Sequence, residues 1–436
     1  MKTKITRSKF IKNTFLGNIL YPFYCQFFNP IYKPLLERIS SKEFDPLREG
    51  NSLEDDYWKM LRLQFPLTRD RNYFNTGGLG PSPQIVIDTV YEWMLKLETI
   101  SESGYKEVAS VHKKAASLFR VKPKEIAITR NTTEGVNIMA RSLPLKRGDE
   151  VLMTTHEHPG AAIPWIALKK DKGINIKLIE PDLSGENNFQ IIEQNISSKT
   201  KVVAIPHVTC TNGMILPVKE IAAFCKSKNI FFCVDGAQAV GMINVDLEDI
   251  SPDLYATSGH KWLLGPKGSG LLYMNESIME KLNPVYVGPY SVDNYSLNEL
   301  EQTYRKEANR EEYATRATPL IMGLGAAIDF ITSVGIKDIE ERGRKLSTYL
   351  IEELQKIRGI EILSPSNPEF SSAIVTFKLK GKDFKKIQAS FRKDYQCRLR
   401  GIVENNLNAL RVSCGIQNSF EELDKLLLGV KNLASS

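Results

Sequence analysis

Short apolar runs that end on polar or glycine residues recur along the chain and predict a buried parallel sheet. The clearest run covers residues 230–234 and ends on Asp235, and a second at 254–257 leads into Ser258-Gly259-His260-Lys261. Runs of this length bounded by Gly and Asp are typical of strands buried on both faces. Ligands of such sheets bind beyond the carboxyl ends of the strands. We therefore expect Asp235 and Lys261 at one ligand-binding edge.

The remaining pattern alternates between strand-like and helix-like segments, which predicts an α/β fold. Further strands are expected at 125–129, 150–153, 202–206, 270–274, 371–379 and 410–414. Helices are expected from about 83, at 133–140, at 320–334, at 339–357 and at 420–430. A length of 436 residues allows two or three domains. We predict an N-terminal extension at 1–65, a large domain at 66–317, and bridging helices with a small C-terminal domain at 318–436.

An acid and an amine delivered to the same sheet edge suit one particular chemistry. A lysine can form a Schiff base with pyridoxal phosphate (PLP) while a carboxylate holds the pyridine nitrogen. Asp235 and Lys261 have the residue types and the placement for these two roles. Spacing alone leaves the plainer interpretation open, in which both are ordinary strand-end and surface residues.

Two sequence blocks resolve that choice by resemblance. The segments VDGAQ (234–238) and SGHKWLLGPKG (258–268) resemble the class V aminotransferase family, and further matches extend from about 72 to 427. The family comprises fold-type I PLP enzymes, among them cysteine desulfurases, selenocysteine lyases and isopenicillin N epimerase. The resemblance implies a three-layer αβα large domain with a mostly parallel seven-stranded sheet, plus a smaller α+β C-terminal domain.

The resemblance assigns the covalent and ring-binding roles. Lys261 would form the Schiff base and later move the Cα proton. Asp235 would hold the pyridine nitrogen protonated, because a nearby anion favours the cationic ring. Gln238 would bond the phenolic oxygen of the cofactor, since Cys210 stands where desulfurases usually have an asparagine.

The phosphate of the cofactor is expected at a helix N-terminus, where hydroxyls and backbone N–H groups bind anions. The turn NTTEG (131–135) matches the phosphate-binding turn of the family and points to Thr132 and Thr133. Ser258 and His260 match further phosphate contacts. Thr315 matches a threonine that reaches the phosphate of the neighbouring subunit, which implies a homodimer with shared active sites.

A histidine of the family stacks on the pyridine ring, where an imidazole can also relay protons. His158, directly after Glu157, matches it, and His156 is the alternative. Both follow a predicted strand, where a histidine otherwise often serves as a local hydrogen-bonding residue.

Four residues are candidates for contacts with the substrate. Arg411 matches the arginine that grips the substrate carboxylate with two parallel hydrogen bonds. Gly77 and Gly78 lie in an N-T-G-G loop that allows close backbone approach. Arg316 follows Thr315 in a segment where Ala314 replaces the glycine of the family.

The cysteines argue against one subclass of the family. Desulfurases carry a nucleophilic cysteine shortly before the carboxylate-binding arginine, but residues 400–407 contain none. Cys397 lies upstream in a strand-like stretch and Cys414 lies after Arg411. A persulfide mechanism needs a thiolate that attacks the substrate sulfur. The leading hypothesis is therefore an aminotransferase or epimerase acting at the Cα of an amino acid or amine, with a keto acid as partner in transamination. The alternative is a cysteine desulfurase, selenocysteine lyase or other C–S lyase.

Composition narrows the remaining partners. The 58 Lys and Arg exceed the 51 Asp and Glu by seven, and no nucleic-acid-binding motif is present. The six cysteines and five histidines show no zinc-site spacing, so no metal is expected.

The first 32 residues are basic and then aromatic, which resembles a targeting segment without a clear cleavage site. Three interpretations stay open: an extension that packs on the protein, a weak interfacial membrane anchor, and a degenerate export signal. A catalytically silent, membrane-attached protein is a third functional hypothesis. We expect a cytoplasmic enzyme, with membrane association or export as alternatives.

Overall fold

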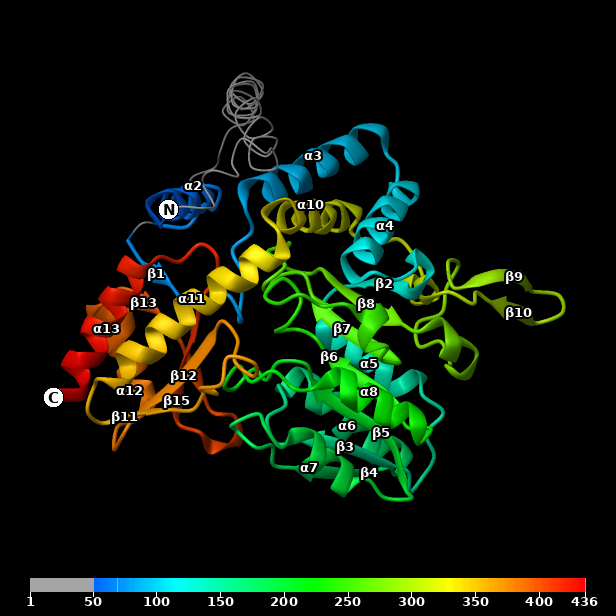
Figure 1. Ribbon diagram of the computed structural model, residues 1–436. Helices are drawn as coiled ribbons and strands as arrows, with labels where there is room; N and C mark the ends of the chain where they lie inside the picture. The colour runs from blue at the N-terminus through cyan, green and yellow to red at the C-terminus, as the bar shows by residue number, and fades with distance from the viewer. Residues whose placement is uncertain (1–50, 69, 436) are drawn as a thin grey trace, which may run out of the picture. The chain divides into compact units, whose positions relative to one another are not determined.

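Seven strands form the central sheet of the protein, and helices cover it (Figure 1). The computed structural model describes residues 51–68 and 70–435, so the hypotheses about the first 50 residues lie outside the described part. The chain divides into two compact units, Met1–Tyr57 and Trp58–Ser436, and the features below belong to the second except residues 51–57 of the first described helix. The predicted boundaries at 65/66 and 317/318 stay predictions.

The central sheet is mostly parallel, as predicted. Its strands in spatial order are β2 (Ile126–Thr129), β8 (Gly270–Met274), β7 (Leu254–Ser258), β6 (Phe231–Asp235), β5 (Thr200–Pro206), β3 (Glu150–Thr154) and β4 (Asn175–Ile179). Within this sheet β8 runs antiparallel to both neighbours, and the other neighbouring pairs are parallel. The carboxyl ends of the other six strands therefore lie at a common edge.

Six of the seven strands form where the apolar runs were found and are almost fully buried, whereas the edge strand β4 was not predicted and is largely accessible. A large core cluster joins one face of the sheet to α5 (Thr132–Ser142) and α6 (Pro159–Lys172), with Val136, Met139 and Trp165 among its members. Other helices of this part are α3 (Gln84–Ile100), α4 (Val108–Phe119), α7 (Asn188–Asn195), α8 (Val218–Ser227) and α9 (Leu247–Ile250). Burial on both faces explains why these strands read as continuous apolar runs.

A second, antiparallel sheet follows in the C-terminal part. Its strands in spatial order are β11 (Ile360–Ile362), β12 (Ile374–Leu379), β15 (Ala409–Ser413) and β14 (Arg400–Ile402). The helices α11 (Ile336–Gln355) and α12 (Phe384–Asp394) pack against it, and α13 (Phe420–Ser435) packs against these two helices. Helix α10 (Thr318–Val334) precedes them and packs on α3 and α4.

Two smaller strand pairs complete the described part. β1 (Asn72–Tyr73) runs parallel to β13 (Cys397–Arg398), and β9 (Val292–Ser296) forms a hairpin with β10 (Glu301–Tyr304) that projects from the body in Figure 1. Helix α2 (Asn51–Arg62) is the first described element. No single described helix is long and apolar enough to cross a membrane; by length and composition alone, only α10 and α11 together could, and they meet at a 75° bend.

The two sheets are joined at the loop after β5. Thr376 Oγ1 donates to Thr211 O at 2.8 Å, and Asn212 Nδ2 donates to Leu363 O at 3.0 Å. Ser364 Oγ returns a bond to Asn212 O at 2.6 Å. These buried bonds fix the edge of the central sheet against β12, the neighbour of the strand that carries Arg411.

Candidate active site

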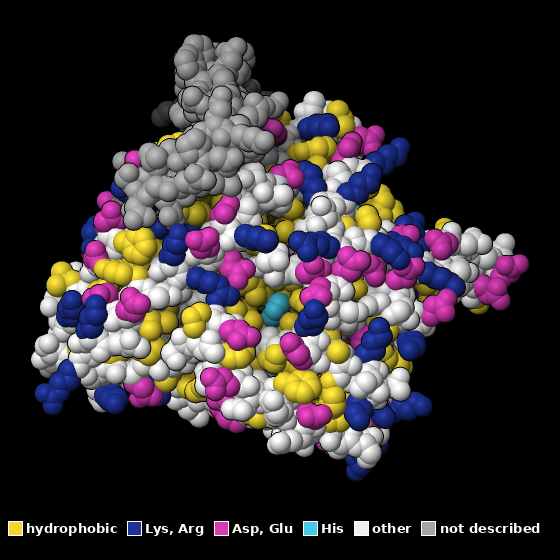
Figure 2. Space-filling view, viewed as in Figure 1, with side chains coloured by type: hydrophobic (Ala, Val, Ile, Leu, Met, Phe, Trp, Pro, Cys, Tyr) yellow, Lys and Arg dark blue, Asp and Glu magenta, His cyan; other side chains and the backbone are white. Residues whose placement is uncertain are grey.

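The predicted site residues follow the carboxyl ends of parallel strands at one edge of the central sheet. β6 ends on Asp235, and β7 ends three residues before Lys261. β2 leads into the first residue of α5, Thr132, and β3 leads into the segment that contains His158. On the face in Figure 2, histidine surface lies in a hollow with acidic and basic side chains around it. The topology therefore delivers these residues to one place, as expected for a sheet of this kind.

Lys261 and Asp235 act on each other electrostatically. Burial lowers the pKa of the Lys261 amine, and the charge of Asp235 opposes that shift. Burial raises the pKa of the Asp235 carboxyl, and the charge of Lys261 opposes that shift in turn. Ala237 N donates to Asp235 Oδ1 at 2.8 Å, which orients the carboxylate. The lowered pKa increases the neutral fraction of the Lys261 amine, and a lysine must be neutral to act as a nucleophile or to accept a proton.

The start of α5 and the end of β7 form a polar cluster. Thr132 N donates to Ser258 Oγ at 2.9 Å, and the two hydroxyl oxygens lie 2.6 Å apart. Asn131 caps the helix by accepting from Glu134 N at 2.9 Å. Thr133 is exposed on the same first turn. A capped N-terminus with two hydroxyls is a site for an anion.

His260 lies between Ser258 and Lys261, and it lacks a partner for one ring nitrogen. Its Nδ1 is buried and has no hydrogen-bond partner among the described residues. Burial, with the charges of Lys261 and Lys267, lowers the pKa of His260 to about 4. A neutral imidazole with an unpaired buried nitrogen can bond a ligand at this position.

The two histidines after β3 have different surroundings. His156 is fully buried and engaged at both nitrogens: Nδ1 lies 2.6 Å from Thr211 Oγ1, and Nε2 lies 3.2 Å from Glu180 Oε1. His158 instead caps α6, because its Nδ1 accepts from Gly160 N at 3.0 Å. That bond assigns the proton of the neutral ring to Nε2.

His158 also belongs electrostatically to the site around Lys261. Burial, followed by the charges of Lys261 and Arg400, lowers its pKa to about 4. It is therefore a neutral ring with one free N–H, whereas His156 is tied into a structural network. The geometry favours His158 over His156 for a contact with a ligand.

The N-T-G-G loop approaches Lys261 through a glycine that sequence reasoning missed. Gly80 N donates to His260 O at 2.7 Å, and a Cβ on Gly80 would lie only 1.9 Å from Lys261 O. Gly77 faces the site, where an added Cβ would meet Gln238 Oε1 at 2.6 Å and Arg411 Nη2 at 3.3 Å. Gly78 faces the side chain of Asn75 instead.

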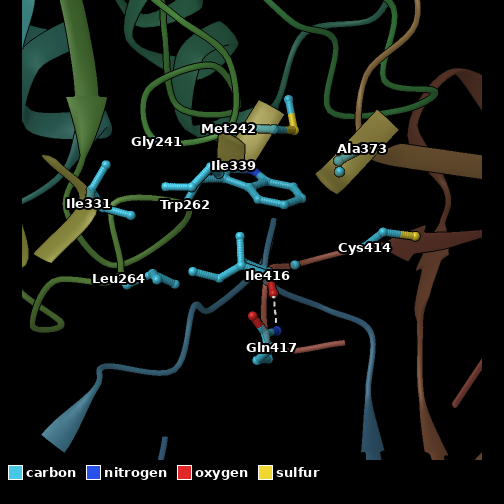
Figure 3. Close-up of a pocket in the computed structure, with 13 residues that line it drawn as sticks. Gly241, Met242, Trp262, Leu264, Ile331, Ile339, Ala373, Cys414, Ile416 and Gln417 are labelled. Carbon is cyan, nitrogen blue, oxygen red and sulfur yellow. Dashed lines mark hydrogen bonds between the residues drawn. The ribbon is translucent and has the colours of Figure 1, made fainter. Parts of the chain in front are cut away.

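Gln238 is held from two sides. Its Nε2 donates to Gly77 O at 2.8 Å, and its Oε1 accepts from Trp262 Nε1 at 2.8 Å. One Nε2 hydrogen remains for another acceptor. The side chain of Trp262 lines a small cavity of about 10 Å³, together with Met242, Ile416 and neighbouring apolar residues (Figure 3). The residue after Lys261 is thereby anchored against the C-terminal part.

Arg411 is fully buried, which its position near the start of a strand did not predict. Its Nη1 donates to Cys210 O at 2.7 Å, and its Nη2 lies 3.5 Å from Asn75 Oδ1. Its Nε is buried and unpartnered among the described residues. Burial and the neighbouring charge of Arg400 lower the pKa of Arg411 to about 9. A desolvated guanidinium with unused donors is a strong carboxylate-binding group.

Thr315 and Arg316 are not among the groups around Lys261 within one chain. Arg316 Nη1 donates to Ile128 O at 2.7 Å and lies 3.5 Å from Glu312 Oε2. Thr315 is exposed at a cavity of about 330 Å³ that Arg316 also lines. A contact of Arg316 with substrate in its own chain is therefore disfavoured.

Three residues near the site were missed in the sequence. Arg400 lies directly opposite Arg411 in the β14–β15 register, and it pairs with Glu404. Glu157 is buried near Asp235, and burial raises its pKa to about 8. Glu157 could have been noticed in the sequence because it directly precedes His158. In contrast, only the strand register reveals that Arg400 faces Arg411.

The cysteines of the described part are free and buried: Cys210, Cys225, Cys233, Cys397 and Cys414. Burial raises the pKa of each thiol, so none of them is an activated thiolate. The described residues contain no group of three or more His, Cys, Asp or Glu suited to a metal.

The aminotransferase class-V family model matches residues 93–426. The chain belongs to the class V aminotransferase family. A probable cysteine desulfurase from Pyrococcus abyssi is 29% identical over 394 residues, which cover 86% of this chain and 97% of that protein.

Solved structures agree with this assignment. The apo cysteine desulfurase from Thermococcus onnurineus NA1 is 27% identical with a TM-score of 0.80, covering 86% of this chain and 98% of that one. The cystine C–S lyase C-DES, solved with its product cysteine persulfide, is 28% identical with a TM-score of 0.78, covering 85% and 99%. A mutant of C-DES carries glycine linked covalently to PLP. The class V chain is thus a fold-type I, PLP-dependent enzyme.

The residues at the sheet edge fit PLP. Asp235 keeps acceptor capacity beyond its single bond to Ala237 N. The hydroxyls of Thr132 and Ser258 meet at the N-terminus of α5. His260 Nδ1 and Arg411 Nε are buried without partners among the described residues, as donors and acceptors awaiting a ligand would be. The donor set therefore suits an anionic ligand with a basic ring nitrogen.

Proposed function

We propose that this enzyme uses PLP to cleave a carbon–sulfur bond of cysteine or a cysteine derivative. The observation that carries the proposal is the buried guanidinium of Arg411 beside Lys261, in a chain whose relatives are cysteine desulfurases and a cystine C–S lyase. These relatives favour the alternative of the sequence analysis over its leading hypothesis, an aminotransferase or epimerase. A specificity like that of isopenicillin N epimerase has no support among them.

The residues predicted to bind the cofactor hold different parts of it. Asp235 holds the pyridine nitrogen, and Gln238 Nε2 offers its remaining hydrogen to the phenolic oxygen. His158 lies against the ring. The phosphate group binds at the start of α5, through Thr132, Thr133, Ser258 and His260. When bound, PLP withdraws electrons from the Cα of the substrate and weakens the bonds around it.

Lys261, His158 and Arg411 then act on the substrate. Arg411 grips the α-carboxylate and fixes the orientation of the Cα–H bond. Lys261, whose pKa burial lowers, accepts the Cα proton at Nζ. His158 keeps its proton at Nε2 and offers a hydrogen bond to the departing sulfur, while the protonated Lys261 Nζ can return a proton to it. Gly77 and Gly80 let the loop lie close against Gln238, Arg411 and the backbone of Lys261.

The sulfur leaves to solution because none of the five cysteines in the described residues is an activated thiolate that could accept it. Cys397 is buried on β13, directly beside Asn72 of β1, whose Nδ2 lies 3.7 Å from its Sγ, and burial raises its pKa. Elimination from cysteine is balanced without a protein persulfide: the C–S bond breaks, the sulfur takes the electron pair, and water completes the products. Cysteine and water give pyruvate, ammonium and hydrogen sulfide.

Product analysis of the PLP-loaded enzyme tests the proposal. With L-cysteine we expect pyruvate and sulfide in equal amounts, and mass spectrometry should find no persulfide on any cysteine. Cys397→Ala should keep this activity. Alanine as the carbon product, with sulfur on Cys397, would instead support desulfurase chemistry. Racemisation or amino-group transfer without sulfur release would contradict the proposal.

We further propose a cytoplasmic homodimer with shared active sites. Exposed Thr315, in a segment that Arg316 anchors to β2, is available to a second chain. We propose an amino acid as the substrate because the relatives are cysteine desulfurases and a cystine C–S lyase. Thr315 would contact the phosphate bound by the neighbouring chain, as the resemblance implies.

A further inference from the structure

Two arginines face each other across a strand pair at the edge of the proposed substrate site. Arg400 and Arg411 are directly opposite in the antiparallel β14–β15 register, so their side chains share one face of the sheet. Cβ atoms of such partners lie about 5 Å apart, and like charges there repel. A nearby anion must offset this repulsion, because Arg411 is fully buried.

Glu404 supplies that anion from the loop that follows β14. Its Oε1 forms an ion pair with Arg400 Nη2, and the two side chains are only 8% and 24% exposed. Val403 N donates to the other carboxylate oxygen at 3.2 Å. An ion pair with this little exposure is much stronger than a pair on the open surface.

The loop that carries Glu404 has a defined conformation. Asn405, Asn406 and Asn408 adopt left-handed backbone angles, with φ of 50°, 53° and 49°, which asparagine tolerates better than most residues. Asn405 Nδ2 donates to Glu180 Oε1 at 3.0 Å and lies 3.2 Å from His156 Nε2. The loop is therefore anchored to the central sheet while it holds Glu404 at Arg400.

Arg400 reaches into the site as well as toward Glu404. Its positive charge contributes to the lowered pKa of Lys261, of His158 and of Arg411. The guanidinium of Arg400 thus lies near that of Arg411, which is assigned to the α-carboxylate of the substrate. The carboxylate of Glu404 already pairs with Arg400.

We propose that Glu404 is a specificity-determining residue: by occupying Arg400, it selects substrates whose side chain carries no second carboxylate. A substrate such as cysteine leaves the ion pair intact. A dicarboxylic substrate such as cystine must displace Glu404 from Arg400, which leaves a poorly solvated carboxylate without its partner. This inference rests on the proposed function for its choice of substrates.

The variant Glu404→Gln in the PLP-loaded enzyme tests the proposal. We expect the ratio of kcat/KM for cystine to that for cysteine to rise at least about tenfold, as one freed charge-assisted contact allows. By calorimetry, glutarate should bind at least about tenfold more tightly than to the wild type, and propanoate should change less than about twofold. Adding Arg400→Gln should abolish the gain for glutarate.

Asn405→Ala is the matched control, since it loosens the loop at Glu180 but keeps Glu404. It should leave the cystine-to-cysteine ratio of kcat/KM, and the affinity for glutarate relative to propanoate, near those of the wild type. An equal loss for both ligands in Glu404→Gln, or no change in either, would overturn the proposal and leave Glu404 a structural residue. The calorimetric arm needs no turnover, so it decides this inference even if the enzyme cleaves no C–S bond.

Discussion

Asp235 illustrates what single residues revealed in the sequence and what they concealed. An apolar run that ends on an acid predicts a strand-end carboxylate, and β6 ends on that residue. Residue type and placement also led to Lys261, whereas His158 and Arg411 were identified through the family resemblance. Glu404, Arg400 and Gly80 were missed, because their importance depends on which backbone or charge faces them across the fold.

His207, directly behind Asp235, provides a prediction at the residue scale. Its backbone N donates to Asp235 O at 2.9 Å, and its Nδ1 lies 2.9 Å from Tyr255 OH. Burial lowers the pKa of His207 to about 4, below the value of about 6.5 in an unfolded chain. Between these values the unfolded state binds more protons, so the stability from this residue is lost as pH falls from 6.5 toward 4.

We therefore expect His207→Asn to be less stable than wild type at pH 7 and to lose less stability on acidification. In that window the gap between the two should close by about 1.4 kcal/mol per pH unit. Urea unfolding at pH 7, 6 and 5 measures this difference in unfolding free energy between the two proteins. Parallel pH dependence in the two proteins would mean that His207 is not held neutral.

Elements with strong patterns were predicted correctly, and those shaped by contacts were not. Continuous apolar runs gave β5, β6, β7 and β8 to within two residues, because burial on both faces leaves an unambiguous signal. The hairpin β9–β10 was missed: Leu297 and Leu300 at its tip are 77% and 87% exposed, so no amphipathic pattern marks it. The short β14 was missed as well, although it carries Arg400.

The loop of residues 75–80 provides a prediction at the element scale. Asn75 bridges to Ser413, and Gly80 packs against the backbone of Lys261. Gly80→Ala would place a methyl group 1.9 Å from Lys261 O, where only backbone movement relieves the clash. We expect a loss of about 1–3 kcal/mol in stability and weaker PLP binding.

Thermal unfolding and PLP titration measure these two effects. Gly325→Ala, in the middle of α10, is the control, because its methyl group would meet the side chain of Val111 at 3.0 Å, a tight contact that a small side-chain shift relieves without backbone movement. If Gly80→Ala binds PLP as tightly as this control, the close approach of the loop does not matter for the site.

At the scale of the whole molecule, the site forms where two sheets meet. The central sheet supplies Asp235 and Lys261, and the C-terminal sheet supplies Arg411 through the bonds around Thr211 and Asn212. Sequence patterns identify each sheet separately but contain no information on their junction. The family resemblance supplied that part of the prediction, and the matched fold agrees with it.

Shared active sites predict complementation between two inactive chains. In a mixed dimer of Lys261→Ala and Thr315→Ala chains, one site combines an intact Lys261 with an intact Thr315 from the partner. Random exchange should then restore about a quarter of wild-type activity, since half of the dimers carry one complete site of two. Activity no higher than the sum of the separate variants would show that Thr315 serves its own chain or no site.

The central claim is that Lys261 and Asp235 share one bound PLP, and borohydride reduction tests it most directly. Reduction of the PLP-loaded enzyme should fix the cofactor to a single lysine, identified by peptide mapping. We predict a phosphopyridoxyl group on Lys261, no label on exposed Lys267 six residues later, and much weaker labelling in Asp235→Asn. An unmodified Lys261 in cofactor-saturated protein, or a label on another lysine, would contradict the account.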